Sequence, residues 1–224
     1  MIYVTGDMHG EHGKLLAAEK EVSLQEGDLL IVCGDFGYIF KDNKQEQLFL
    51  DEIETRPYTL CFVDGNHENF EALYRYPQQD WNGGQVHRIR NNIFHLMRGQ
   101  IYEIDGKSIF TMGGAYSIDK YFRTEGLSWW PEELPNREEY DTAIRNLLGR
   151  GKKVDYVLTH TMPYKTIWTN GWFPDPHDRE LTGFLEWILY EIQYKHWFCG
   201  HFHVDMDLLP ERISILLDLV RPME

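Results

Sequence analysis

The chain has 224 residues, of which 42% are hydrophobic, so it is long enough to bury one substantial core and too short for two catalytic domains; we expect a single domain over residues 1–224. The 36 acidic residues outnumber the 22 basic ones and give a formal net charge of −14, which argues against extended nucleic acid or an anionic membrane as a partner. A local phosphate site remains compatible with this charge, because bound divalent cations can invert the field of the surrounding carboxylates.

The apolar stretches of the sequence are all short. None approaches the roughly 20 apolar residues that cross a bilayer, and no charged and then apolar leader precedes Ile2. The cysteines Cys33, Cys61 and Cys199 are odd in number and lack a disulfide-like spacing, which suits a reducing compartment. We therefore expect a cytoplasmic protein without a membrane anchor.

Short β-branched or apolar runs recur along the chain and predict buried strands. In chain order they cover residues 2–5, 29–33, 59–63, 154–158 and 197–199. Segments with helical spacing of apolar residues lie between or after them, at residues 12–24, 43–54, 136–148 and 179–194. This alternation is typical of an α/β fold with helices on the faces of a sheet.

The region of residues 85–115 has a different pattern. Short alternating runs and the pair Asp105-Gly106 predict a meander of antiparallel strands with a tight hairpin. Residues 204–208 and 213–217 predict a second hairpin near the end of the chain. Residues 117–135 and 163–178 are irregular and rich in Trp, Tyr, Pro and Gly, so they either shape a lid or cover the core.

Polar residues that can ligate a metal follow each of the five predicted strands. They lie in the motifs Gly6-Asp7-Met8-His9, Gly34-Asp35, Gly65-Asn66-His67-Glu68, Thr159-His160 and Gly200-His201-Phe202-His203. Each motif alone is weak evidence, because Asp often caps helices and a lone His is often structural. Together they supply the oxygen and nitrogen ligands that suit two divalent transition metals, at strand ends where ligand sites gather in α/β sheets.

These five motifs, in this order, resemble the calcineurin-like metallophosphoesterase superfamily, and the resemblance spans the chain from Asp7 to His203. It implies a four-layer α/β/β/α sandwich with two mixed β-sheets and a two-metal site at the carboxyl ends of the strands. It also implies a role for each motif residue: Asp7, His9 and His203 for the first metal, Asn66, His160 and His201 for the second, and Asp35 as the bridge. The resemblance further implies that His67 is the catalytic histidine, which donates a proton to the leaving oxygen or stabilises the transition-state charge, and that a metal-bound water or hydroxide is the nucleophile.

The sequence departs from the Ser/Thr protein phosphatases of that superfamily after Asp35. Those proteins continue with Asp-Arg-Gly, which orients the catalytic histidine and grips phosphate, whereas this chain reads Phe36-Gly37. We therefore expect a different subclass, and the motifs do not identify the partner of His67. Arg123 and Lys120 are the candidates for binding the substrate phosphate, and Arg98 is a weaker one.

The sequence thus predicts a dinuclear metal-dependent phosphatase or phosphodiesterase that acts on a small phosphorylated substrate, a monoester or a diester. Two alternatives remain: a nuclease or cyclic-nucleotide phosphodiesterase, and a non-catalytic metal-binding scaffold of the same fold. The ligand set accepts manganese, iron, zinc, cobalt or nickel. The sequence leaves the oligomeric state and the physiological substrate open.

Overall fold

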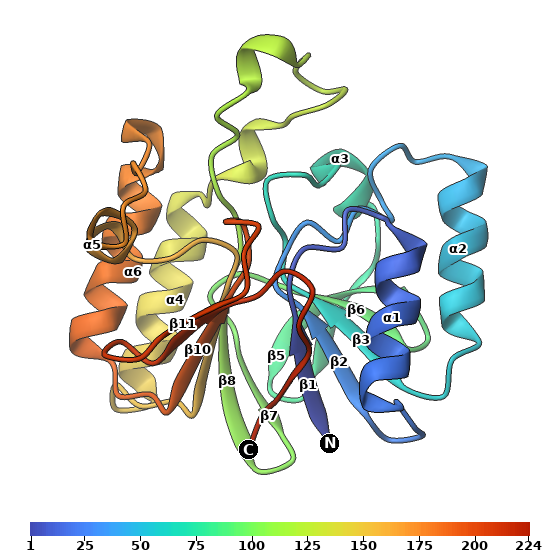
Figure 1. Ribbon diagram of the computed structural model, residues 1–224, viewed down its shortest axis with the longest axis horizontal. Coiled ribbons are helices and arrows are strands. Elements are labelled where there is room, and N and C mark those ends of the chain that lie inside the picture. The colour runs from blue at the N-terminus through green and yellow to red at the C-terminus, as the bar shows by residue number, and fades with distance from the viewer.

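The computed structural model describes residues 1–224 and contains two mixed β-sheets that pack face to face (Figure 1). The first sheet has the strand order β13-β1-β2-β3-β6-β5-β4. Its strands are β1 (Ile2–Thr5), β2 (Leu29–Val32), β3 (Thr59–Phe62), β4 (Gln78–Trp81), β5 (Gly84–Arg90), β6 (Ile93–Leu96) and β13 (Arg221–Pro222). Strands β1, β2, β3 and β6 are parallel, and the edges of the sheet are antiparallel.

The second sheet has the order β11-β12-β10-β9-β8-β7. Its strands are β7 (Ile101–Ile104), β8 (Lys107–Met112), β9 (Tyr156–Thr159), β10 (His196–Cys199), β11 (Met206–Leu208) and β12 (Ile213–Ile215). The four inner strands are parallel, and β7 and β11 close the two edges as hairpin partners of β8 and β12. The predicted C-terminal hairpin is therefore confirmed.

Helices cover the outer face of each sheet (Figure 1). Helices α1 (His12–Val22) and α2 (Lys44–Glu54) share a buried core with the first sheet, whereas α4 (Arg137–Gly149), α5 (Tyr164–Thr169) and α6 (Arg179–Glu191) share one with the second. A third core, which includes Val4, Ile31, Leu158 and Phe198, fills the space between the sheets. The four-layer α/β/β/α arrangement is thus confirmed.

Local chemistry explains where the helices begin and end. Asn136 caps α4 by accepting a hydrogen bond from the backbone N–H of Glu139, whose side chain accepts one from the N–H of Asn136 in return. Helix α1 ends earlier than predicted because Ser23 adopts a left-handed conformation. Helix α6 also ends early, at Glu191, because Ile192 is already extended on the way into β10.

The prediction of one antiparallel meander over residues 85–115 is wrong, because its strands belong to two different sheets. Strands β5 and β6 form an antiparallel pair in the first sheet, and β7 and β8 form one in the second. The chain crosses between the sheets after Leu96, so one run of alternating residues builds an edge of each. The sequence also did not predict the short strands β4 and β13 or the single-turn helix α3 (Phe70–Leu73).

The irregular segment of residues 117–135 contains two short 3₁₀ turns, Lys120–Phe122 and Pro131–Glu133, and projects beyond the strand ends at the top of Figure 1. The second irregular segment contains α5 and the 3₁₀ turn Pro176–Asp178. All three cysteines are buried and free. None of the helices has both the length and the apolar character that crossing a membrane requires.

Candidate metal centre

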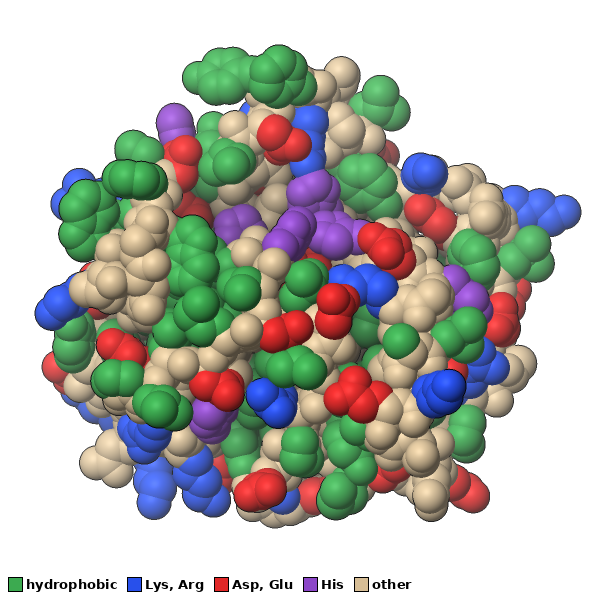
Figure 2. All heavy atoms as spheres, viewed as in Figure 1, with side chains coloured by type: hydrophobic (Ala, Val, Ile, Leu, Met, Phe, Trp, Pro, Cys, Tyr) green, Lys and Arg blue, Asp and Glu red, His purple; other side chains and the backbone are tan.

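The five motifs meet at one edge of the molecule because their strands end level with one another. In the first sheet Thr5 of β1 pairs with Val32 of β2, which pairs with Phe62 of β3, so the loops after them start at the same height. In the second sheet Met112 pairs with Thr159, the last residue of β9 before His160. Figure 2 shows the histidines gathered on this face, beneath the projecting segment.

Asp7, His9, Asp35 and His203 form a first cluster, in which one potential ligand atom from each lies within 4.8 Å of the others. Nε2 of His9 lies 3.2 Å from Nε2 of His203, which lies 3.3 Å from Oδ2 of Asp7. Nε2 of His9 is also 3.7 Å from Oδ2 of Asp35. The four side chains thus converge on one point.

Asn66, His160 and His201 form a second cluster beside the first. Oδ1 of Asn66 lies 3.1 Å from Nε2 of His160 and 3.1 Å from Nδ1 of His201. Two further contacts fix the cluster: Nδ1 of His160 is 2.8 Å from the carbonyl oxygen of Cys33, and the amide of Asn66 donates to Oγ of Ser117. These contacts turn Nε2 of His160 and Oδ1 of Asn66 toward each other.

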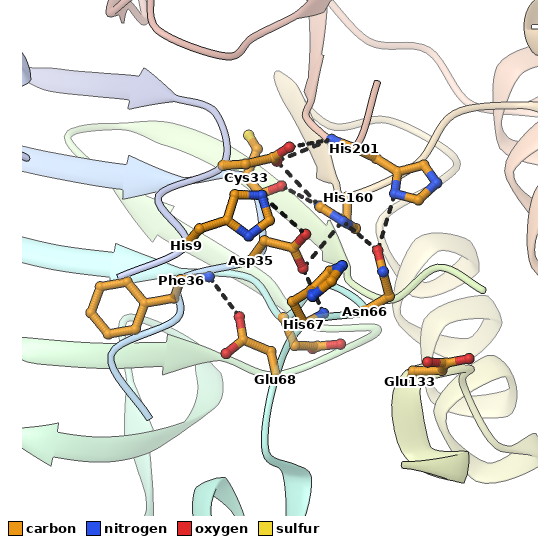
Figure 3. Close-up of polar contacts among 12 residues, drawn as sticks. His9, Cys33, Asp35, Phe36, Asn66, His67, Glu68, Glu133, His160 and His201 are labelled. Carbon is orange, nitrogen blue, oxygen red and sulfur yellow. Dashed lines mark hydrogen bonds and ion pairs between the residues drawn. The ribbon is translucent and has the colours of Figure 1, made fainter. Parts of the chain in front are cut away.

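Asp35 lies between the two clusters (Figure 3). Its Oδ2 is the oxygen that faces His9, whereas its Oδ1 lies 3.5 Å from Nε2 of His160. Oδ1 also accepts a hydrogen bond of 2.7 Å from the backbone N–H of His67. One carboxylate therefore presents a different oxygen to each cluster.

The two clusters fit divalent transition metals. Ligand atoms about 2.1 Å from one ion lie roughly 3 to 3.5 Å from each other, and most of the separations above fall in or close to this range. The separation of 3.2 Å between Nε2 of His9 and Nε2 of His203 suits two ligands of one ion. The donor set would accordingly hold one ion in each cluster, with Asp35 shared.

Several of the predicted ligands have a backbone conformation that is rare for residues other than glycine. The φ angles are 49° at His9, 49° at Asp35, 70° at His201 and 51° at His203. Positive φ in bulky residues costs free energy and is concentrated at functional sites, where the surrounding structure enforces it. Here it turns the loops sharply after the strands and aims neighbouring side chains at the centre.

Two motif glycines make room for predicted ligands that come from other loops. A Cβ on Gly34 would lie 2.1 Å from Nδ1 of His160, and one on Gly200 would lie 2.2 Å from Oδ1 of Asp7. Both separations are shorter than any real Cβ contact. Glycine is therefore required at these positions by the close approach of a ligand from a distant part of the chain.

The buried carboxylates and imidazoles of the centre shift one another's protonation. Burial alone would raise the pKa of Asp35, but His160, with His67 and His9, lowers it. Burial would lower the pKa of His160, yet Asp35 and Asp7 raise it to about 10. Burial and the neighbouring His160 lower the pKa of His201 to about 3. A divalent cation bound here would replace the proton that the carboxylates of Asp35 and Asp7 stabilise on His160.

His67 lies beside the clusters and contacts Arg123. Nη2 of Arg123 is 2.8 Å from Nε2 and 3.0 Å from Nδ1 of His67. Asp119 holds the guanidinium by accepting a hydrogen bond of 2.8 Å from its Nε. Burial lowers the pKa of His67, Asp35 opposes this effect, and the positive charge of Arg123 adds to the lowering.

The other two candidates for binding phosphate are engaged elsewhere. The ammonium of Lys120 pairs with Glu133 and lies 4.2 Å from the ring centres of both Tyr116 and Trp129. The guanidinium of Arg98 is buried and pairs with Asp64, to which its Nε donates a hydrogen bond of 2.8 Å. The structure therefore brings Arg123 to His67 and directs Lys120 and Arg98 to structural partners.

Sequence reasoning missed three residues that support the centre. Oε1 of the buried Glu68 accepts a hydrogen bond of 2.7 Å from the N–H of Phe36, which fixes the loop of Asp35. Asp64 pairs with Arg98 and so fixes the start of the loop that carries Asn66. Ser117 accepts a hydrogen bond from the Asn66 amide and orients it. Glu68 and Asp64 flank the Gly-Asn-His motif in the sequence, and this position could have suggested a supporting role. Nothing in the sequence around Ser117 suggests such a role.

Two cavities open on either side of His67. The smaller, about 310 Å³, also contacts His9 and is bordered by Phe40, Lys41 and Gln45. The larger, about 490 Å³, is bordered by Asp35, Asn66, His201 and His203, and aromatic residues such as Trp172 and Phe173 also line it. Both cavities therefore border side chains of the predicted metal centre, and His67 lines both.

Comparisons with known proteins agree with this geometry. A family model described as calcineurin-like phosphoesterase matches residues 1–205. Among solved structures, a protein from Staphylococcus aureus that is provisionally named a 5'-nucleotidase, in complex with alpha-ketoglutarate, superimposes with a TM-score of 0.53 at 15% sequence identity. The match covers 96% of this chain and 47% of that one, so the chain spans about half the length of that protein. No curated protein matches the sequence.

Proposed function

Because the chain belongs to the calcineurin-like phosphoesterase family, we propose that it is an enzyme that hydrolyses esters of small phosphorylated molecules with the help of two divalent transition metal ions. Asp7, His9 and His203 would hold one ion, Asn66, His160 and His201 the other, and Asp35 would bind both. When bound, such ions neutralise phosphate oxygens and lower the pKa of water toward neutrality.

The observation that carries this proposal is the position of Asp35 between two complete ligand sets. A single structural metal needs no second cluster, whereas hydrolysis at a two-metal site needs a shared carboxylate that keeps the ions roughly 4 Å apart. The two oxygens of Asp35 face His9 and His160 respectively, which suits that role.

The residues beside the clusters suit the remaining chemistry. His67 can carry a proton at one ring nitrogen to the oxygen of the departing alcohol. Arg123 contributes a positive charge within hydrogen-bond distance of His67, where it can attract a phosphate oxygen. A non-catalytic scaffold would need neither group, which is why we favour an enzyme.

Metal analysis combined with ester hydrolysis tests this function. The purified full chain is expected to bind about two ions after reloading with manganese, iron, zinc, cobalt or nickel. At least one reloaded form should hydrolyse p-nitrophenyl phosphate or bis(p-nitrophenyl) phosphate, and chelation should abolish the reaction. Two bound ions with no hydrolysis of either ester under any reloading would instead identify a metal-binding scaffold.

A further inference from the structure

We propose that the substrate is a phosphodiester whose two alcohol groups occupy the two cavities on either side of His67. This inference rests on the proposed hydrolytic function and specifies its substrate class. The larger cavity would take an aromatic substituent, and the smaller one a polar substituent.

The first argument is the shape of the site. His67 is the only side chain that lines both cavities: His9 borders the smaller one, and Asp35, Asn66 and His203 border the larger. A phosphate bound over the ligand clusters therefore has an opening on each side. A monoester has a single organic substituent and would fill one opening, whereas a diester has one substituent for each.

The second argument is charge. At neutral pH a phosphate monoester carries close to two negative charges, since its second pKa is about 6, and a diester carries one. Arg123 is the cation beside His67, and Asp119 already accepts a hydrogen bond from it. Asp119 and Asp175 border the larger cavity and are paired with Arg123 and His177, and no Lys or Arg lines it, so its wall offers no free Lys or Arg to a second negative charge on the substrate.

The walls of the larger cavity suit an aromatic group that carries a hydrogen-bond donor or acceptor. Trp172, Phe173 and Phe202 supply aromatic surface. Thr161 also lines the cavity, and its buried hydroxyl has no hydrogen-bond partner in the protein. A buried hydroxyl without a partner is costly, and a polar atom of a bound substituent would satisfy it.

The smaller cavity has a more polar lining. Lys41, Asn43 and Gln45 contribute an ammonium and two carboxamides, and Phe40 and Phe49 cover one side. Glu46 also lines this cavity, and its Oε2 has no hydrogen-bond partner, so the lining favours a neutral substituent with hydroxyl groups. The two halves of the substrate are therefore expected to differ in chemistry.

The reaction balances without a further reactant. Water attacks phosphorus, one ester P–O bond breaks, and the departing oxygen takes the proton carried by His67. The proton lost by the water returns to His67 through solvent. The products are one alcohol and one phosphate monoester.

Hydrolysis of paired esters by the manganese-loaded full chain tests the inference. We expect kcat/KM for bis(p-nitrophenyl) phosphate to exceed that for p-nitrophenyl phosphate at least tenfold. Diphenyl phosphate should also compete more strongly than phenyl phosphate for the site, which gives a readout of binding. Faster hydrolysis of the monoester would overturn the inference and leave the proposed function intact, whereas hydrolysis of neither ester would overturn both.

Two variants separate the cavities. Gln45→Trp places a bulky ring in the smaller cavity and should lower kcat/KM for the diester at least fivefold more than kcat/KM for the monoester. Gln25→Trp, at an exposed glutamine that lines neither cavity, is the control and should change neither value. Phe173→Ala should raise KM for the diester roughly fivefold, whereas Phe122→Ala should not, since Phe122 is 95% exposed and lines neither cavity. Equal loss of both substrates in Gln45→Trp would contradict the assignment of the smaller cavity.

Discussion

The guanidinium of Arg123 lies within 2.8 Å of Nε2 of His67, although 56 residues separate the two in the chain. Both residues are absent from the ligand clusters, and Arg123 comes from the projecting segment rather than from a strand end. Ser/Thr protein phosphatases of the superfamily carry a further Asp-Arg-Gly after their Gly-Asp motif, whereas this chain reads Phe36-Gly37-Tyr38-Ile39 after Asp35. Arg123 would provide the same positive charge from a different part of the chain.

Replacing Arg123 should impair catalysis and leave metal binding unchanged. Arg123→Ala is expected to lower kcat/KM by roughly 100-fold, the loss typical of one charged donor to a transition state. Arg123→Lys should recover part of the activity, because lysine keeps the charge and loses the planar pair of donors. Steady-state kinetics at saturating metal measure both effects. Arg137→Ala, at an arginine whose side chain is 95% exposed, serves as the control and should behave as wild type.

His67→Ala should retain both ions and lose most of the hydrolysis, since His67 contacts Asp35 only through its backbone N–H. The loss is expected to be about 100-fold to 10,000-fold in kcat, the range for a positioned general acid. Metal content by mass spectrometry and turnover of an aryl phosphate are measured on the same sample. Normal turnover in the metal-saturated variant would show that another group donates the proton.

Asp35→Asn should lower the occupancy of both metal sites, because each carboxylate oxygen faces a different cluster. Asparagine tolerates the positive φ of 49° at this position, so the loop should keep its conformation. Metal content should fall below one ion per chain, and hydrolysis should fall with it. Asp42→Asn is the matched control, because Asp42 has the same φ of 49° and pairs only with the surface residue Arg75. Full occupancy in Asp35→Asn would rule out a bridging role.

Gly200→Ala should displace Asp7, because the new Cβ would lie 2.2 Å from its Oδ1 and 2.8 Å from the carbonyl oxygen of Cys33. We expect loss of the ion held by the first cluster and a lower melting temperature. Gly183→Ala in α6 meets no atom within 4 Å and should stabilise the protein by about 0.5 to 1 kcal/mol. If both variants bound metal equally, the close packing at Gly200 would have no functional consequence.

Folding stability should depend on the buried His87. Burial and the nearby His95 lower the pKa of His87 to about 3, so the folded protein keeps it neutral while the unfolded chain takes up a proton below about 6.5. The neutral His87 therefore contributes fully to the free energy of unfolding above about pH 6.5, and this contribution is lost as the pH falls from about 6.5 toward 3. Urea unfolding at pH 7.5 and pH 5 should show a loss of up to about 2 kcal/mol from this group. His87→Gln should reduce the loss, and an unchanged loss would exclude His87 as its source.

Much of the fold could be predicted from the sequence because its signals are local. The strand that ends at Thr5 and the one that ends at Val32 are short apolar runs followed by Gly-Asp, and both the strands and their turns follow from nearest neighbours. The caps of α2 and α4 are likewise readable from Asn43 and Asn136. The division of residues 85–115 between two sheets could not be predicted, because alternation of apolar and polar residues indicates a strand but does not identify the strand with which it pairs.

The motifs alone placed the ligand types at the strand ends, because each ligand is within a few residues of the strand that positions it. The tertiary structure decided what those side chains face. Only the packing of two sheets brings His160 against Gly34 and sets the two oxygens of Asp35 toward different clusters. Only the path of the projecting segment turns Arg123 toward His67 and Lys120 toward Glu133. Such contacts join residues tens to more than a hundred positions apart, and their geometry depends on packing that no local pattern records.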